Sequence, residues 1–314
     1  MATFSTKTKN ELARLIPVNR CCRKAELTAL ILTDGDIWLD SKSEAALTLA
    51  TENAAVARKI IMLGKTLFSL QSTILLQRNK RLKKKNQYII SIGRQPGVVE
   101  ALAELGLPGE GVLSRRLPKP PRKNCCRRSY LRGIFLGAGS LNRPEGGNYH
   151  LEINLPDEDF CQAVCQLLLK FGLNPKVNYR KNRYVIYLKN SEEIVDLLNI
   201  IGAHAALLDF ENARVIKQLR NKVNRLVNCE TANLEKTVDT GMRQLESIKK
   251  IAQTIGLQSL PEGLREMAEV RLANPDASLK ELGYMLSPAI GKSGVNHRLR
   301  RLEEIAQKIE GNKR

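Results

Sequence analysis

The sequence predicts an α+β protein in which two copies of one αββαββα unit are followed by an all-α helix-turn-helix domain. A repeated phrase is the first sign of the duplication. CCRKAELTALILTDGDI begins at Cys21, and CCRRSYLRGIFLGAGSL begins at Cys125, 104 residues further along the chain. The same order of segments follows each phrase. Near the end of the chain, a stripe of apolar residues at helical spacing follows a short helix and a break, which predicts the helix-turn-helix.

Each element of the first copy follows from the spacing of its apolar residues. In order, the first copy has a helix that ends at Asp34-Gly35, strands at 36–41 and 45–52, a helix at 54–69, a hairpin with a basic tip at 72–92 and a helix at 97–106. Gly106 and Pro108 end the last of these helices, since neither continues a helix well.

The second copy repeats this order. It has a helix at 130–139, a strand at 148–156, a helix at 157–172, a hairpin at 176–190 and a helix at 191–202. Between the copies, the segment GVLSRRLPKPPRKN contains three prolines and shows no periodicity, which is typical of a linker. The predicted domains are a first half at 1–111, a basic linker at 112–128, a second half at 129–220, an interdomain linker at 221–233 and a helix-turn-helix domain at 234–314.

The C-terminal domain carries signals for two helices joined by a tight turn. Ser278 and Glu281 have the spacing of a capping box, which opens a short helix, and Pro288 and Gly291 end it. The second helix has a single apolar stripe, made by Val295, Leu299, Leu302, Ala306 and Ile309. In a helix-turn-helix this second helix enters the major groove of DNA.

Side chains opposite the stripe are the candidates for reading bases. At 100° per residue, that face presents Ser293, Asn296, His297 and Arg300. Asparagine pairs well with adenine and arginine with guanine. Three basic residues flank this face, and we expect them to contact phosphates: Lys292, Arg298 and Arg301.

Net charge supports a polyanionic partner. The chain has 51 Lys and Arg against 32 Asp and Glu, a formal charge of +19. Neither 53–99 nor 111–144 contains an acidic residue, and Lys83, Lys84 and Lys85 form the tip of the first hairpin, where we expect phosphate contacts. Double-stranded DNA is the predicted partner, and a merely solvated basic surface is the alternative. No apolar run reaches the length of a membrane span, so no membrane contact is expected.

Two such halves would join their sheets into one concave surface lined by basic strands and hairpin tips. This architecture resembles the LAGLIDADG homing-endonuclease fold, in which the repeated helix pair forms the interface between the halves. Gly133 and Gly137 would allow that close packing. The endonuclease reaction needs one acid at the end of each repeated helix to hold metal ions. The matching positions here are Asp34 and Ala138, and a methyl group binds no metal, so we expect a degenerate site without nuclease activity.

The sequence offers no other catalytic centre, and we expect no cofactor, no metal and no small-molecule substrate. It contains no GxSxG, no HExxH and no complete P-loop. The two Cys-Cys pairs are able in principle to give four thiolates to one metal. Adjacent cysteines are unusual ligands for a tetrahedral site, where spacings of two to four residues prevail, so we expect reduced thiols near helix starts.

Two stretches carry a resemblance to a known family. GIFLGAGSLNRPEGGNYHLEI and LKELGYMLSPAIGKSGVNHRLRRL together resemble the WhiA family of bacterial DNA-binding regulators. The resemblance implies a degenerate LAGLIDADG domain and a helix-turn-helix similar to the promoter-reading region of sigma factors. It implies a transcriptional role in sporulation, cell division or chromosome segregation. It also implies a sigma factor or RNA polymerase as a partner and a cytoplasmic, nucleoid-associated location. The alternatives are an active metal-dependent endonuclease and a sigma-factor-binding adaptor.

Overall fold

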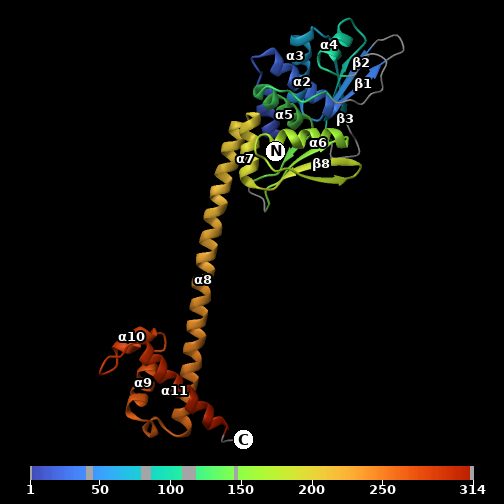
Figure 1. Ribbon diagram of the computed structural model, residues 1–314. Coiled ribbons are helices and arrows are strands. Elements are labelled where there is room, and N and C mark those ends of the chain that lie inside the picture. Colours follow the sequence, from blue (N-terminus) through green and yellow to red (C-terminus); the bar gives the residue numbers. More distant parts are fainter. Residues whose placement is uncertain (1, 40–44, 79–85, 108–117, 145–147, 312–314) are drawn as a thin grey trace. The chain divides into compact units, whose positions relative to one another are not determined.

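A computed structural model describes residues 2–39, 45–78, 86–107, 118–144 and 148–311 of the chain (Figure 1). The chain divides into two compact units, Met1–Gln218 and Leu219–Arg314. The boundary between them falls inside the helix α8 (His204–Thr254), which includes the segment predicted as the interdomain linker. Each unit is described by itself.

The first half of the N-terminal unit has the predicted order of elements. These are α2 (Arg20–Asp34), β1 (Gly35–Leu39), β2 (Ala45–Thr51), α3 (Ala54–Phe68), β3 (Thr73–Arg78), β4 (Asn86–Ile92) and α4 (Val98–Glu104). The strands form an antiparallel sheet in the order β1-β2-β4-β3. Alternate residues of β2, such as Leu47 and Leu49, are buried, because successive side chains of a strand point to opposite faces of a sheet.

The second half repeats the first. It consists of α5 (Asn124–Ala138), β5 (Gly139–Leu141), β6 (Leu151–Leu155), α6 (Glu158–Leu169), β7 (Lys176–Arg180), β8 (Arg183–Leu188) and α7 (Ser191–Ile201). Its sheet has the order β5-β6-β8-β7, which matches the first sheet strand for strand. The α+β prediction with two repeated halves is confirmed, and the three-residue β5 is an addition to it.

An unpredicted helix, α1 (Phe4–Arg14), precedes the first half. The Thr3 side chain caps it by accepting a hydrogen bond from the backbone N–H of Thr6 at 3.1 Å. Leu12 is fully buried, while most of the helix is polar. The helix therefore contributes few apolar side chains to the core and leaves a weak periodic signal in the sequence.

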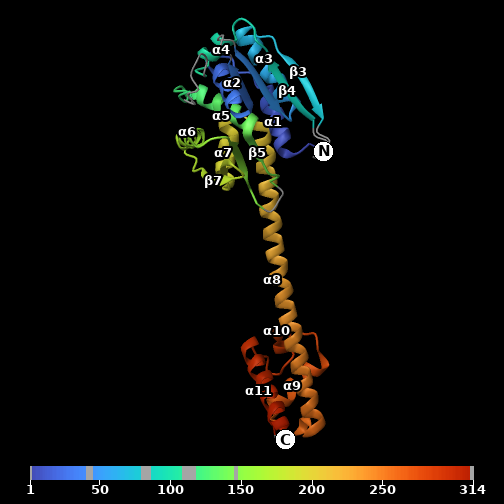
Figure 2. The same cartoon turned by 90° about the vertical axis from the view of Figure 1, so that its right-hand side faces the viewer.

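Helices α2 and α5 lie side by side and form the interface between the halves (Figures 1 and 2). A Cβ atom added to Gly133 would lie 2.5 Å from the backbone oxygen of Glu26, and one added to Gly137 would lie 2.0 Å from Oγ1 of Thr33. Only glycine fits at distances this short. The predicted close packing of the two helices through these glycines is confirmed.

A buried ion network crosses the same interface. Nζ of Lys59 lies 2.5 Å from Oε1 of Glu26, and NH1 of Arg132 lies 3.5 Å from Oε2 of the same carboxylate. The side chains of Glu26 and Lys59 are fully buried. Arg132 also donates from Nε to the backbone oxygen of Ile201 at 2.6 Å. Burial raises the pKa of Glu26 and lowers the pKa of Lys59, since it disfavours both charged forms.

The C-terminal unit is all-helical. Besides its share of α8 it contains a 3₁₀ turn (Leu257–Ser259), α9 (Glu262–Ala273), α10 (Leu279–Tyr284) and α11 (Lys292–Gly311). Its separate core gathers apolar side chains from all of these helices, including Ile251, Met267, Leu282 and Leu299. The predicted all-α helix-turn-helix domain is confirmed.

Candidate nucleic-acid interface

Local sequence fixes both the start of α10 and the turn between α10 and α11. The Ser278 side chain accepts a hydrogen bond from the N–H of Glu281 at 3.3 Å, and the Glu281 carboxylate accepts one from the N–H of Ser278 at 2.7 Å. This is the predicted capping box. The N–H of Ile290 donates to the Gly283 oxygen at 3.0 Å. A Cβ on Gly283 would lie 2.2 Å from the oxygen of Ile290, so glycine is required for this tight turn.

One face of α11 is held in the core. The predicted stripe residues Val295, Leu299, Leu302 and Ala306 are buried, and Ile309 packs against them. Leu282 and Leu286 face the same core, whereas half of the Met285 side chain is exposed. With one face anchored against α9 and α10, the opposite face of α11 is presented to solvent.

The exposed face carries most of the predicted base-reading residues. Ser293, His297 and Arg300 are exposed in the first turns of α11, and Lys292 and Arg301 are exposed beside them. The sequence has no acidic residue from Lys292 to Leu302, and acids return at Glu303. The start of α11 is therefore its basic, accessible part.

Two predicted contacts lie at the margins of this face. Asn296 is half-buried and, with Arg300 and α8 residues that include Gln244, lines a cavity of about 640 Å³. Arg298 donates from NH1 to the backbone oxygen of Gly263 at 3.2 Å, and NH1 lies 3.8 Å from the Glu266 carboxylate. The structure thus engages Arg298 in holding α11 against α9, and it places Asn296 and Arg300 beside α8.

The two sheets of the N-terminal unit have different open faces. In the second half, Arg180, Lys181, Arg183 and Lys189 line a concave pocket of about 420 Å³, as expected for a basic surface. In the first half, Trp38 pairs with Ala46 and Leu75 pairs with Ile89 on the open face.

Trp38 and Leu75 are exposed by 67% and 63% of their surface. The expectation that basic strands line both halves is wrong for these described strands, because they place no Lys or Arg on the open face of the first sheet, where apolar residues alternate with polar ones such as Thr48 and Gln87. The predicted phosphate contacts Lys83, Lys84 and Lys85 lie outside the described residues.

The two positions that match the catalytic acids of LAGLIDADG endonucleases are equivalent in the two halves. Asp34 is the last residue of α2, and Ala138 is the last residue of α5. Burial raises the pKa of Asp34 to about 6, and the nearby charges of Lys9 and Arg183 partly oppose this rise. Ala138 offers no ligand atom, so the helix ends supply one carboxylate where a shared metal needs two.

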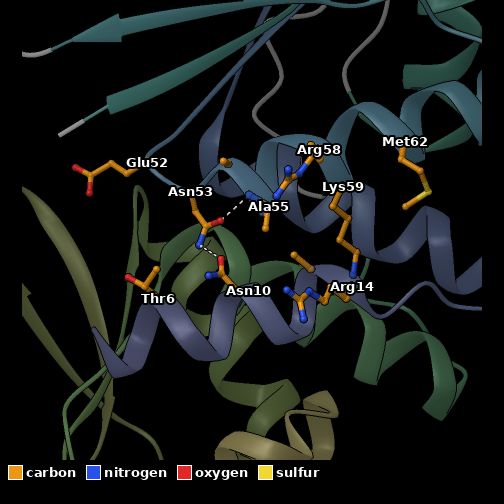
Figure 3. Close-up of a pocket in the computed structure, with 11 residues that line it drawn as sticks. Thr6, Asn10, Arg14, Glu52, Asn53, Ala55, Arg58, Lys59 and Met62 are labelled. Atoms are coloured by element: carbon orange, nitrogen blue, oxygen red, sulfur yellow. Dashed lines mark hydrogen bonds between the residues drawn. The ribbon is translucent and has the colours of Figure 1, made fainter. Parts of the chain in front are cut away.

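A second concave region of the N-terminal unit lies between α1 and α3 (Figure 3). It has a volume of about 600 Å³ and is lined by polar residues such as Arg14 and Arg58. Nδ2 of Asn53 donates to Oδ1 of Asn10 at 2.9 Å across it, as Figure 3 shows. Nζ of Lys59 donates to the backbone oxygens of Leu12 and Leu15. These contacts join α1 to α3, so the region stabilises the fold around the α2–α5 interface.

Sequence relatives place these features in a family. A protein of Desulforamulus reducens named "Probable cell division protein WhiA" is 52% identical over 318 residues, covering 99% of this chain and 97% of that protein. This chain belongs to the WhiA family. A WhiA protein of the same description from Desulfitobacterium hafniense is 54% identical, with 98% of this chain and 96% of that protein covered.

WhiA domain models account for most of the chain. The WhiA N-terminal LAGLIDADG-like domain matches residues 20–108, the WhiA LAGLIDADG-like domain matches 127–220, and the WhiA C-terminal HTH domain matches 223–306. The crystal structure of full-length DUF199/WhiA from Thermatoga maritima is similar at a TM-score of 0.62 and 30% identity, covering 98% of this chain and 99% of that one. Among the described residues, no helix is both long and apolar enough to cross a membrane.

Proposed function

We propose that this chain is a sequence-specific, DNA-binding transcription regulator that acts in cell division, chromosome segregation or sporulation and is associated with the nucleoid. The exposed face of α11 is the observation that carries the proposal. Ser293, His297 and Arg300 project from a helix whose other face is locked in the helix-turn-helix core. This is how a recognition helix meets base edges in the major groove. The names of the WhiA relatives favour the cell-division role.

Arg300 is the residue we expect to discriminate most strongly between sequences. Its exposed guanidinium matches the two acceptors of guanine, and a good bidentate pair is worth about 1–3 kcal/mol. Lys292 and Arg301 are suited to phosphates, which add affinity without sequence information. Asn296 reaches bases only from the edge of the face, and we assign Arg298 to holding α11 in place.

Binding-site selection with the full chain, followed by titration of the selected duplex and a random duplex, tests the proposal. Arg300→Ala should lose about 1–3 kcal/mol on the selected duplex and little on random DNA. Lys308→Ala, on an exposed residue in the last turn of the same helix, is the matched control and should leave specificity unchanged. Affinity should also fall steeply with salt, with a slope of about 0.9 per phosphate neutralised. Equal losses on both duplexes would assign Arg300 to phosphate contact.

We also propose that the protein does not cleave DNA. Ala138 removes one of the two carboxylates that the LAGLIDADG reaction requires, and Asp34 is partly withdrawn from solvent with a raised pKa. Supercoiled plasmid incubated with the protein and Mg²⁺ or Mn²⁺ should stay intact over a range of salt. Cleavage that is lost in Asp34→Asn would refute this part of the proposal and support the endonuclease alternative.

The open face of the first sheet favours a second contact, with a protein. Trp38, Leu75 and Ile89 place apolar side chains on a face whose described strands carry no Lys or Arg, which suits a protein partner better than a phosphate backbone. A sigma factor or RNA polymerase is the partner we propose. Trp38→Ala should weaken its co-purification with the regulator and leave DNA affinity unchanged, whereas a loss of DNA affinity would assign this face to DNA.

A further inference from the structure

Four cysteines, two from each half, meet where α2 and α5 begin. The Sγ atoms of Cys22 and Cys126 are 3.9 Å apart, and those of Cys125 and Cys126 are 4.0 Å apart. With Cys21 included, all four sulfurs lie within 4.8 Å of one another. The two pairs stand far apart in the sequence, so the packing of α2 against α5 is what gathers them.

This spacing fits one tetrahedral metal ion. Zinc–thiolate bonds of about 2.3 Å place the sulfurs about 3.8 Å apart, so a small contraction of the cluster is sufficient. A disulfide requires its sulfurs about 2 Å apart, and the cysteines here are free. We propose that Cys21, Cys22, Cys125 and Cys126 bind one Zn²⁺, which joins the two halves of the N-terminal unit. Binding converts four thiols to thiolates and releases their protons to solvent.

The unusual ligand spacing has a structural explanation. Adjacent cysteines are unusual ligands of a tetrahedral zinc ion, because the side chains of two neighbouring residues seldom reach the same ion. Here each pair stands in the first turn of a helix and has one buried residue, Cys22 or Cys126, and one exposed residue, Cys21 or Cys125. The four sulfurs therefore surround a point at the surface, which the ion can reach from solvent.

The surroundings of both pairs are built alike. Nε of Arg23 donates to the Pro17 oxygen at 2.6 Å, and Nε of Arg127 donates to the Pro121 oxygen at 3.2 Å. These matching contacts hold the turn before each pair, which orients the sulfurs. The described first turn of each helix has no acidic residue and no capping side chain, so two uncapped helix starts face the cluster. Helix N-termini favour thiolates there.

Elemental analysis of the full chain, expressed without a histidine tag and purified without chelators, tests the proposal. We expect about one zinc per chain, lost when a mercurial reagent blocks the thiols. The Co²⁺-substituted protein should show the visible absorption of tetrahedral thiolate coordination. Less than about 0.2 zinc per chain after incubation with equimolar Zn²⁺ and desalting would overturn the proposal. Iron or copper in place of zinc, or a disulfide within the cluster, would overturn it as well.

Variants separate binding by the cluster from adventitious zinc. The double variant Cys21→Ser with Cys125→Ser changes only exposed sulfurs, so it should fold, yet its zinc content should fall at least about fivefold. Cys22→Ser should act in the same way. Cys229→Ser, on an exposed cysteine of α8 outside the cluster, is the control and should keep its zinc. Full zinc content in the folded double variant would refute the site.

Discussion

Replacing Asp34 by asparagine should stabilise the protein at neutral pH. The pKa of Asp34 rises from 3.8 to about 6 in the folded state, because the carboxyl is largely buried at the end of α2. An acid with a raised pKa binds its proton more tightly when folded, so the ionised form destabilises the fold. The penalty is fully present above pH 6 and disappears below about pH 4. The pKa difference corresponds to about 3 kcal/mol, and partial exposure reduces it to about 2–3 kcal/mol.

Urea unfolding followed by circular dichroism at several pH values measures this effect. Asp34→Asn should exceed the native protein in unfolding free energy by about 2–3 kcal/mol at pH 7.5 and by about half of that at pH 5. The advantage should nearly vanish at pH 4. Asp36→Asn, on an exposed neighbour in β1, is the control and should change stability by less than about 0.5 kcal/mol. An advantage independent of pH, or no advantage at pH 7.5, would refute the burial argument.

Three further substitutions probe the interfaces. Gly137→Ala should cost about 1–3 kcal/mol of unfolding free energy, because the new methyl would overlap a neighbouring hydroxyl. Gly64→Ala is the control: its methyl would meet Cδ1 of Ile92 at an ordinary 3.9 Å, so this change should be neutral or stabilising in the same denaturation assay. Glu26→Gln leaves the buried Lys59 without its counter-charge and should lower the thermal midpoint, with a loss of about 3–5 kcal/mol; an unchanged midpoint would contradict the ion network. Ser278→Ala removes the α10 cap and should cost about 0.5–2 kcal/mol, seen as faster amide exchange in α10.

The repeat, its element order and the buried stripe of α11 were predictable because they depend on local periodicity. The stripe from Val295 to Ala306 needs only the helical repeat, and the glycines of α5 signalled close packing. The α1 helix was missed because few of its residues are apolar, and β5 because three residues carry no period.

The features that the sequence did not predict depend on contacts between residues far apart in the chain. A helical wheel places Asn296 and Arg298 correctly around α11, but it does not show that α8 and α9 lie beside them. In the same way, the sequence displays two Cys-Cys pairs, yet only the packing of α2 on α5 brings their sulfurs together. The exposure of Trp38 and Leu75 on the first sheet's open face likewise depends on which strand residues point outward.

The ion pair between Glu26 and Arg132 at the α2–α5 contact makes the two halves of the N-terminal unit chemically different. Glu26 sits on one helix and its partner Arg132 on the other, while the residues at the equivalent repeat positions are Tyr130 and Thr28. In a first half that paired with another copy of itself, each Glu26 would keep Lys59 but would face Thr28, which offers no guanidinium. In two paired second halves, each Arg132 would face Tyr130, which offers no carboxylate. Charge complementarity therefore favours pairing of the first half with the second half, in addition to their covalent linkage.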